Sequence, residues 1–229
     1  MTPTGPREMT GSRWSFYVDP IGEYMKISWN DFVEECRNCQ ACPLSKTRKN
    51  VVIYRGSVVA PIMFVGEGPG ANEDEQGLPF VGQAGQLLQL LLDAQGFSME
   101  DFHIANVVKC RPPENRVPTE AEAKTCKVLL GKQILISKPK IIVLLGKTAY
   151  TLFTGDKMAK MTEIRGKFFE KNGYYILPTF HPAYILRNNN ERIKLWKDIA
   201  LVREKAEELG LMKPLPSAPD MPTARPSGK

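Results

Sequence analysis

Four of the five cysteines in this sequence are spaced as metal ligands. Cys39 and Cys42 form a Cys-x2-Cys pair, and Cys110 and Cys126 form a second pair with 15 residues between them. Four thiolates suit zinc or an iron–sulfur cluster, because soft ligands select soft or borderline metals. The spacing does not separate these two. The alternative is that the cysteines are small buried hydrophobes. Cys36, three residues before Cys39, leaves the membership of the first pair open.

Polar residues of unusual type follow apolar runs at three other places. Gly66-Glu-Gly-Pro-Gly70 comes after the run 61–65, Asn106 stands near the end of the run 102–108, and His181 follows the run 175–178. In an open parallel sheet, ligands bind at the carboxyl ends of the strands. The three segments therefore predict one site at that edge. A strand-end asparagine and a loop histidine with purely structural bonds are the alternatives.

The glycine-rich segment also has the composition of a phosphate-binding loop. It lacks the Gly-Lys-Ser/Thr ending of a P-loop, and Ala71 breaks the Gly-x-Gly-x-x-Gly pattern. Nucleotide binding is therefore the second interpretation of this segment.

Composition and length predict one globular domain. The chain has 229 residues, 42% of them hydrophobic, and a formal net charge of +6, which permits a polyanionic partner without requiring one. We expect a poorly ordered lead over 1–27, a folded domain over 28–210 and a proline-rich disordered tail over 211–229. No run is long enough to cross a membrane, and the start of the chain does not resemble a secretion signal. With an odd number of cysteines, a cytoplasmic location is expected.

Strand and helix signals alternate within the domain. Strands are expected over 61–65, 102–108, 140–145 and 175–178, with an Asn-Gly hairpin turn within 168–175. Helices are expected over 28–36, 84–95, 119–136, 147–153 and 191–209, the first and third opened by capping boxes. This alternation predicts an α/β fold with a mainly parallel sheet covered on both faces.

The motifs together resemble those of the family 4 uracil-DNA glycosylases. The resemblance rests on Gly66-Glu-Gly-Pro-Gly-Ala-Asn-Glu-Asp74, Gly77-Leu-Pro-Phe-Val-Gly82, Asn106-Val-Val-Lys-Cys-Arg-Pro-Pro113 and His181-Pro-Ala-Tyr184. It covers about residues 36–205, and each motif alone would be weak. It implies a three-layer α/β/α domain with a four-stranded parallel sheet, a four-iron four-sulfur cluster, and a monomeric enzyme that removes uracil from single- or double-stranded DNA. The cluster ligands implied are Cys39, Cys42, Cys110 and Cys126.

The resemblance also implies how the flipped base is held. Phe80 would stack on uracil, with the backbone of Gly66 and Gly68 close by. The amide of Asn106 would accept from uracil N3–H and donate to O4, a pattern that cytosine reverses. His181 would donate to uracil O2, where negative charge grows as the glycosidic bond breaks.

A carboxylate is expected to orient the attacking water. Related glycosylase families place an Asp in the first loop, where this chain has Gly68. We expect Glu73 to take this role, with Glu67 as the alternative or as the group that excludes the methyl of thymine. Asp74 is expected to be a solvated loop acid, and His103 a structural residue.

DNA contacts are expected from two segments. The helix that starts near Gly85 would hold a phosphate at its N-terminus. Ile185 or Leu186 would fill the gap left by the extruded base, with Arg187 on a phosphate. The candidates for a basic groove are Lys109, Arg111, Arg116, Arg165 and Lys167.

Two other functions compete with the glycosylase. One is a non-catalytic nucleic-acid-binding protein whose cysteines hold structural zinc or an iron–sulfur cluster. The other is a relative that traps DNA covalently at a histidine, but the segment after Lys109 lacks the histidine-bearing basic insertion that this would need.

Overall fold

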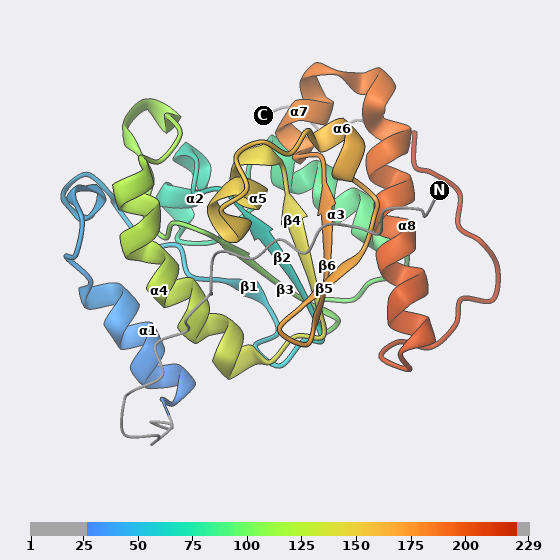
Figure 1. Cartoon of the computed structure of the whole chain (residues 1–229), viewed down its shortest axis with the longest axis horizontal. Helices are drawn as coiled ribbons and strands as arrows, with labels where there is room; N and C mark the ends of the chain where they lie inside the picture. Colours follow the sequence, from blue (N-terminus) through green and yellow to red (C-terminus); the bar gives the residue numbers. More distant parts are fainter. Residues whose placement is uncertain (1–26, 224–229) are drawn as a thin grey trace, which may run out of the picture.

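The computed structural model describes residues 27–223, and the predictions for 1–26 and 224–229 lie outside them. One six-stranded sheet with the order β1-β3-β2-β4-β6-β5 runs through the domain (Figure 1). The strands are β1 (Arg55–Gly56), β2 (Ile62–Gly66), β3 (Phe102–Asn106), β4 (Ile141–Leu145), β5 (Phe169–Lys171) and β6 (Tyr174–Thr179).

The four central strands confirm the predicted parallel sheet. β3, β2, β4 and β6 pair in parallel, whereas β1 and β5 add antiparallel edges. The sheet is thus wider than the predicted four strands, because a two-residue strand such as β1 is too short to show a period in the sequence. The hairpin between β5 and β6 turns at Asn172 and Gly173, both with positive φ, as the Asn-Gly signal predicts.

Helices cover both faces of the sheet. They are α1 (Trp29–Asn38), α2 (Ala71–Gln76), α3 (Gln83–Ala94), α4 (Glu120–Ser137), α5 (Lys147–Thr154), α6 (Met161–Ile164), α7 (Pro182–Arg187) and α8 (Arg192–Glu208), with short 3-10 turns at Pro43–Lys46, Pro113–Asn115 and Asn189–Glu191. The five longer helices match the predicted ones within two residues, but the short α2, α6 and α7 were not predicted. A helix of four to six residues is too short to develop a periodic apolar face.

Two apolar cores lie on opposite faces of the sheet and define three layers. α3 and α8 contribute to one core, and α1, α4 and α5 contribute to the other. Strand side chains alternate between them, so Ile62 and Phe64 face the first core while Met63 and Val65 face the second. Figure 1 shows the sheet between α1 and α4 on one side and α8 on the other.

The segment 211–223 packs on the domain, whereas the sequence predicts a proline-rich disordered tail over 211–229. Over 211–223 it has no helix or strand, but Met221 packs against the core on the α3 and α8 face. The backbone N–H of Leu215 donates to Glu207 Oε1 at 3.3 Å, and Arg203 donates to the carbonyl of Lys213. Leucine and methionine between the prolines supply the apolar surface that holds this segment.

Among the described residues, no helix is both long and apolar enough to cross a bilayer.

Candidate functional site

The register of the sheet brings the predicted segments to one edge. Gly66 of β2 pairs with Asn106 of β3, and Leu145 of β4 pairs with Thr179 of β6, two residues before His181. β2 has β3 on one side and β4 on the other, so a crevice opens at the carboxyl ends of these strands.

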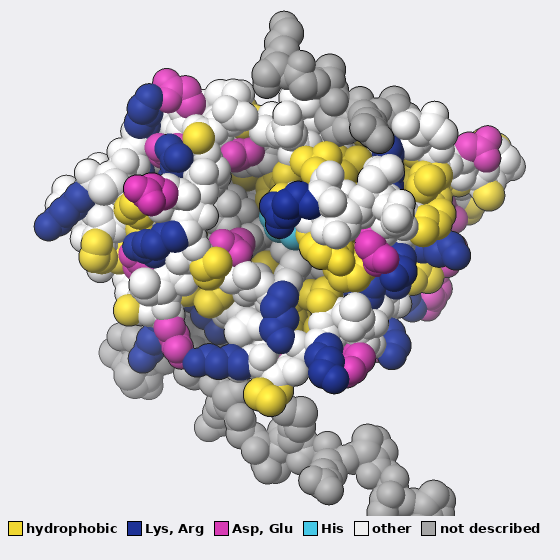
Figure 2. Space-filling model, turned by 90° about the horizontal axis from the view of Figure 1, so that it is seen from above, with side chains coloured by type: hydrophobic (Ala, Val, Ile, Leu, Met, Phe, Trp, Pro, Cys, Tyr) yellow, Lys and Arg dark blue, Asp and Glu magenta, His cyan; other side chains and the backbone are white. Residues whose placement is uncertain are grey.

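A cavity of about 470 Å³ opens at this edge. Figure 2 views the molecule from above Figure 1 and shows a histidine within a hollow, with Lys and Arg side chains around it. His181 lines this cavity, whereas His103 is fully buried. The cavity lining includes Glu67, Gly68, Gly70, Glu73, Phe80, Asn106, Asn115, Arg116, Leu145, Lys147, Thr148, His181, Tyr184 and Arg187.

Asn106 presents an unsatisfied amide oxygen beside this cavity. The residue is 1% exposed, and its Oδ1 accepts no hydrogen bond from the described residues. A Cβ placed on Gly66 would lie 2.4 Å from this oxygen, so only glycine leaves room for the amide at that point. A buried acceptor without a donor costs free energy that a ligand N–H would recover.

Phe80 stands in a strained backbone conformation. Its φ is +55°, which costs a non-glycine residue of order 1–2 kcal/mol. The start of α3 packs tightly against its backbone, since a Cβ on Gly85 would lie 1.9 Å from the Phe80 carbonyl oxygen. The ring of Phe80 lies 5.6 Å from that of His181, with 31° between their planes. The strain thus places an aromatic ring at the cavity wall.

Glu73 holds this loop with both carboxylate oxygens. Oε1 accepts from the backbone N–H groups of Val81 at 3.0 Å and Gly82 at 2.8 Å, and Oε2 accepts from Gly70 N–H at 3.1 Å. The carboxylate joins the glycine-rich loop to the loop that follows Phe80. This geometry favours a positioning role and speaks against the water-orienting role expected for Glu73.

Glu67 is the other carboxyl group of the site, and it hydrogen-bonds the side chain of Thr148. Burial raises the pKa of Glu67, against the opposing effect of the Thr148 hydrogen bond. A Cβ placed on Gly68 would lie 2.6 Å from Val108 Cγ2, so an acidic residue there would require a shift. Of the two carboxyl groups that line the cavity, Glu67 therefore has fewer protein hydrogen-bond partners than Glu73.

Asp74 is not the solvated acid that was expected. It is 2% exposed and accepts from the backbone N–H groups of Lys49 and Asn50 at 3.0–3.2 Å. These bonds attach the segment after the Cys39–Cys42 pair to α2, the helix that also carries Glu73. The loop context alone does not reveal such a backbone partner.

His181 has a defined tautomer. Its Nδ1 accepts from the backbone N–H of Ala183 at 3.0 Å as the N-cap of α7, so the ring proton of the neutral form lies on Nε2. Burial, together with the nearby charge of Arg187, lowers the pKa of His181 to about 4. The ring is therefore a neutral N–H donor near pH 7.

Burial distinguishes Ile185 from Leu186, the two residues expected to fill the gap left by an extruded base. Ile185 is fully buried in the core and cannot enter a duplex, so this part of the prediction was wrong. Leu186 is 38% exposed on the same short helix, beside the exposed Arg187. The six-residue α7 faces the core with one side, a pattern too short to read in the sequence.

The basic-groove candidates also divide. Lys109 is 1% exposed and cannot meet DNA, and Arg165 is paired with the buried Asp198. Arg111 donates to Asn115 Oδ1 at 2.8 Å, and Lys167 is exposed.

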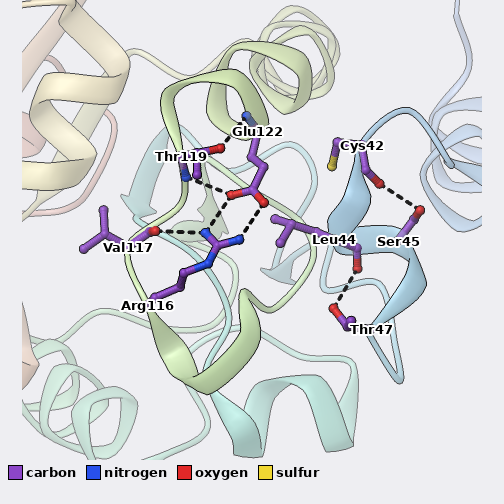
Figure 3. Close-up of polar contacts among 8 residues, drawn as sticks. All are labelled: Cys42, Leu44, Ser45, Thr47, Arg116, Val117, Thr119 and Glu122. Carbon is purple, nitrogen blue, oxygen red and sulfur yellow. Dashed lines mark hydrogen bonds and ion pairs between the residues drawn. The ribbon is translucent and has the colours of Figure 1, made fainter.

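The guanidinium of Arg116 binds both carboxylate oxygens of Glu122 at 2.7 and 2.8 Å (Figure 3). Glu122 also closes the capping box of α4 with Thr119, and the Arg116 hydrogen bond lowers the pKa of this carboxyl to about 2. Figure 3 shows this pair fastening the loop after β3 to the first turn of α4. Arg116 lines the cavity as an anchor of that loop.

The cysteines line a second hollow of about 530 Å³. It contains Cys36 of α1, Cys39 and Cys42 of the segment after α1, Cys110 of the loop after β3, and Cys126 of α4. Arg48 Nη1 donates to Cys110 Sγ at 3.1 Å, and the backbone N–H of Lys109 donates to Cys126 Sγ at 3.3 Å. Donors aimed at sulfur suit thiolate ligands, so this donor set fits a thiolate-bound metal group. No group of three or more His, Cys, Asp or Glu side chains within residues 27–223 is arranged to hold a single metal ion.

Some lining residues were not predicted from the sequence. Leu145, Lys147 and Thr148 come directly after or at the end of β4, and Tyr184 follows His181 by three residues. Lys147 and Thr148 are polar residues that follow an apolar run. The pattern that predicted the other site residues at strand ends could therefore have predicted these two as well.

Comparison with known proteins agrees with this architecture. Residues 53–200 match the model of the uracil DNA glycosylase superfamily, and the chain belongs to this superfamily. A type-4 uracil-DNA glycosylase of Thermotoga maritima is 47% identical over 162 residues, 70% of this chain and 84% of that protein. One from Saccharolobus solfataricus is 47% identical over 179 residues, covering 75% and 83%. A type-5 uracil-DNA glycosylase of Pyrobaculum aerophilum is 26% identical over 216 residues. The similarity is thus greater to the type-4 group, as the motifs predict.

Proposed function

We propose that this chain is a uracil-DNA glycosylase that hydrolyses the N-glycosidic bond of a flipped uracil and leaves an abasic site. The observation that carries the proposal is the unpaired, buried Oδ1 of Asn106 at a cavity walled by Phe80 and His181. Uracil N3–H supplies the missing donor, and uracil O4 accepts from the amide nitrogen. Cytosine offers an acceptor at N3 and donors on N4, so it leaves like groups facing each other.

The neighbouring side chains complete the chemistry. Phe80 stacks on the base, and the Nε2–H of His181 donates to uracil O2 as the glycosidic bond breaks. Because this donor is already oriented by the Nδ1 bond to Ala183, little reorganisation is needed. We assign the orientation of the attacking water to Glu67, since Glu73 already accepts three backbone hydrogen bonds.

The DNA is held around the cavity. Leu186 fills the gap that the extruded base leaves, and Arg187 and Arg111 contact phosphates. The N-terminus of α3, near Gly85, contributes backbone N–H groups. Either single- or double-stranded uracil DNA meets these requirements, with a larger flipping cost in the duplex.

We further propose that Cys39, Cys42, Cys110 and Cys126 hold a four-iron four-sulfur cluster. The shared hollow and the two N–H donors on sulfur support this assignment. When bound, the cluster would tie the segment after α1, the loop after β3 and α4 together and serve the structure. We also propose that the protein is a monomer in the cytoplasm, where its free Cys36 and its ligand thiols remain reduced.

The test is excision from a uracil-containing oligonucleotide, followed by alkaline cleavage of the abasic site. We expect Asn106→Ala and His181→Ala to reduce the single-turnover rate by about 10²–10³-fold each, as for loss of a transition-state hydrogen bond. Asn190→Ala, an exposed asparagine outside the cavity lining, is the matched control and should keep the wild-type rate. Folded, iron-loaded protein that leaves the oligonucleotide intact would refute the proposal. Zinc in place of iron would refute the cluster.

A further inference from the structure

Lys109 is buried between the two sites. It lies between Asn106 and Cys110 in the sequence and is 1% exposed. Its Nζ donates to the main-chain carbonyl of Asn106 at 2.9 Å and to the side-chain oxygen of Gln133. A lysine is almost never buried without partners for its charge, so this position needs an explanation.

The hydrogen-bond network around Lys109 has one consistent proton arrangement. Gln133 accepts from Lys109 with Oε1, so its amide nitrogen donates to the Ile53 carbonyl at 3.1 Å and to His103 Nε2 at 2.7 Å. His103 Nε2 is then an acceptor, and its Nδ1–H donates to the Ser57 carbonyl at 3.0 Å. Each of these donors has an acceptor, so the ammonium has a fixed place.

Gln133 lies two turns after Cys126 on α4, so one helix carries both a proposed cluster ligand and the acceptor of the Lys109 ammonium. The backbone N–H of Lys109 also donates to Cys126 Sγ at 3.3 Å. Cys36, Cys110 and Cys126 line the same hollow as Lys109. Both hydrogen-bond acceptors of Nζ are neutral, and Lys109 lines the hollow that contains the cysteines.

We propose that Lys109 is a positioning residue that compensates the negative charge of the thiolate-bound cluster and fixes the main chain of Asn106 for uracil recognition. This inference rests on the proposed function. It connects the two sites through three consecutive bonded groups, namely the cluster ligand Cys126, Lys109 and the carbonyl of Asn106. Filling of the sulfur site then stabilises the ammonium, and the ammonium holds the base-reading strand end.

The test compares three variants of the cluster-loaded protein. Lys109→Met removes the charge and both Nζ bonds. Gln133→Met removes one of these Nζ bonds, together with the amide bonds to Ile53 and His103, without changing charge. Lys132→Met removes a half-buried charge of α4 that pairs with Glu35. Two readouts are independent of turnover. One is the midpoint potential of the cluster. The other is the affinity for a single-stranded oligonucleotide with 2′-fluoro-2′-deoxyuridine, whose glycosidic bond resists hydrolysis, relative to the matched 2′-fluoro-2′-deoxycytidine oligonucleotide.

We expect Lys109→Met to lower the preference for the uracil oligonucleotide by about tenfold, as for the loss of one well-placed hydrogen bond to a charged group. Its midpoint potential should become more negative, because a nearby positive charge favours the reduced cluster. Gln133→Met should lower the preference by a smaller factor with little change in potential, and Lys132→Met should change neither.

A folded Lys109→Met protein with wild-type preference and potential overturns the inference. If Lys109→Met does not fold, Gln133→Met decides, and a wild-type preference in that variant overturns it equally. Failure of the proposed function can be told apart from failure of this inference, because it is seen in the wild-type protein. A wild-type protein without iron, or without a preference for the uracil oligonucleotide, overturns the proposed function and this inference together.

Discussion

Replacement of Glu73 separates positioning from catalysis. In Glu73→Gln the amide oxygen can still accept from Val81 and Gly82, but the amide NH2 meets the N–H of Gly70. One charge-assisted bond is lost, so we expect about 2 kcal/mol of destabilisation. Glu73→Ala loses all three bonds and should cost roughly 3–5 kcal/mol, because exposure of the loop lets water replace part of them. Phe80 would then relax from its positive φ.

The assay pairs urea unfolding with single-turnover excision at saturating and limiting DNA. For Glu73→Gln we expect the maximal rate to fall by less than about tenfold, while the apparent affinity for uracil DNA weakens with the loop. Glu67→Gln is the comparison, and its maximal rate should fall by about 10²-fold or more at nearly unchanged stability, as for loss of a catalytic base. A Glu73→Gln protein with wild-type stability and a rate below a thousandth of the wild type would refute the reasoning, since it would make Glu73 the catalytic carboxylate.

Three further outcomes follow from burial and charge. Burial lowers the pKa of His103 and His181 to about 4, so the unfolded state binds protons at a higher pH than the folded state. The free energy of unfolding should therefore fall as the pH drops from 6.5 to 4. A series of denaturant titrations that gives the same free energy across this window would contradict the burial argument. Leu186→Ala should weaken the binding of uracil-containing duplex DNA several-fold with little loss of stability. Ile185→Ala should lower the free energy of unfolding by about 2–4 kcal/mol. If Ile185→Ala instead weakened DNA binding and Leu186→Ala destabilised the fold in thermal unfolding, α7 would be oriented otherwise. The hydrogen bond from Arg116 lowers the pKa of the Glu122 carboxyl to about 2, so the ionised carboxylate stabilises the fold above pH 4.5 and this effect is lost toward pH 2. Glu122→Gln should lower the free energy of unfolding by about 1–2 kcal/mol at pH 7 and flatten its dependence on pH in the acid range. An unchanged pH dependence would refute the pairing.

The parallel sheet and the longer helices could be predicted because their signals are local. A strand such as β4 consists of five consecutive apolar residues, and α4 opens with a Thr119–Glu122 capping box that the structure contains. Two- and three-residue edge strands and helices of four to six residues lack such signals. They form because neighbouring elements offer a hydrogen-bonding edge or an apolar surface, which is a property of the assembled chain.

The tail illustrates the same limit. Five prolines after Leu209 predict a disordered tail, whereas residues 211–223 form an irregular segment that packs on the domain. Whether it packs depends on the surface that α3 and α8 present to Met221, and the composition of the tail does not contain that information.

The sequence by itself determined which kinds of chemistry this protein offers: four spaced thiols, an amide and an imidazole after buried strands, and two carboxylates near a glycine-rich turn. The tertiary structure alone decided how these groups are used. It turned Glu73 toward three backbone N–H groups, left the oxygen of Asn106 without a donor among the described residues, and buried Lys109 between the carbonyl of Asn106 and the cysteine hollow. The physical reason is that residue type sets the available charges and hydrogen-bonding atoms, whereas burial and partner geometry come from segments distant in the chain.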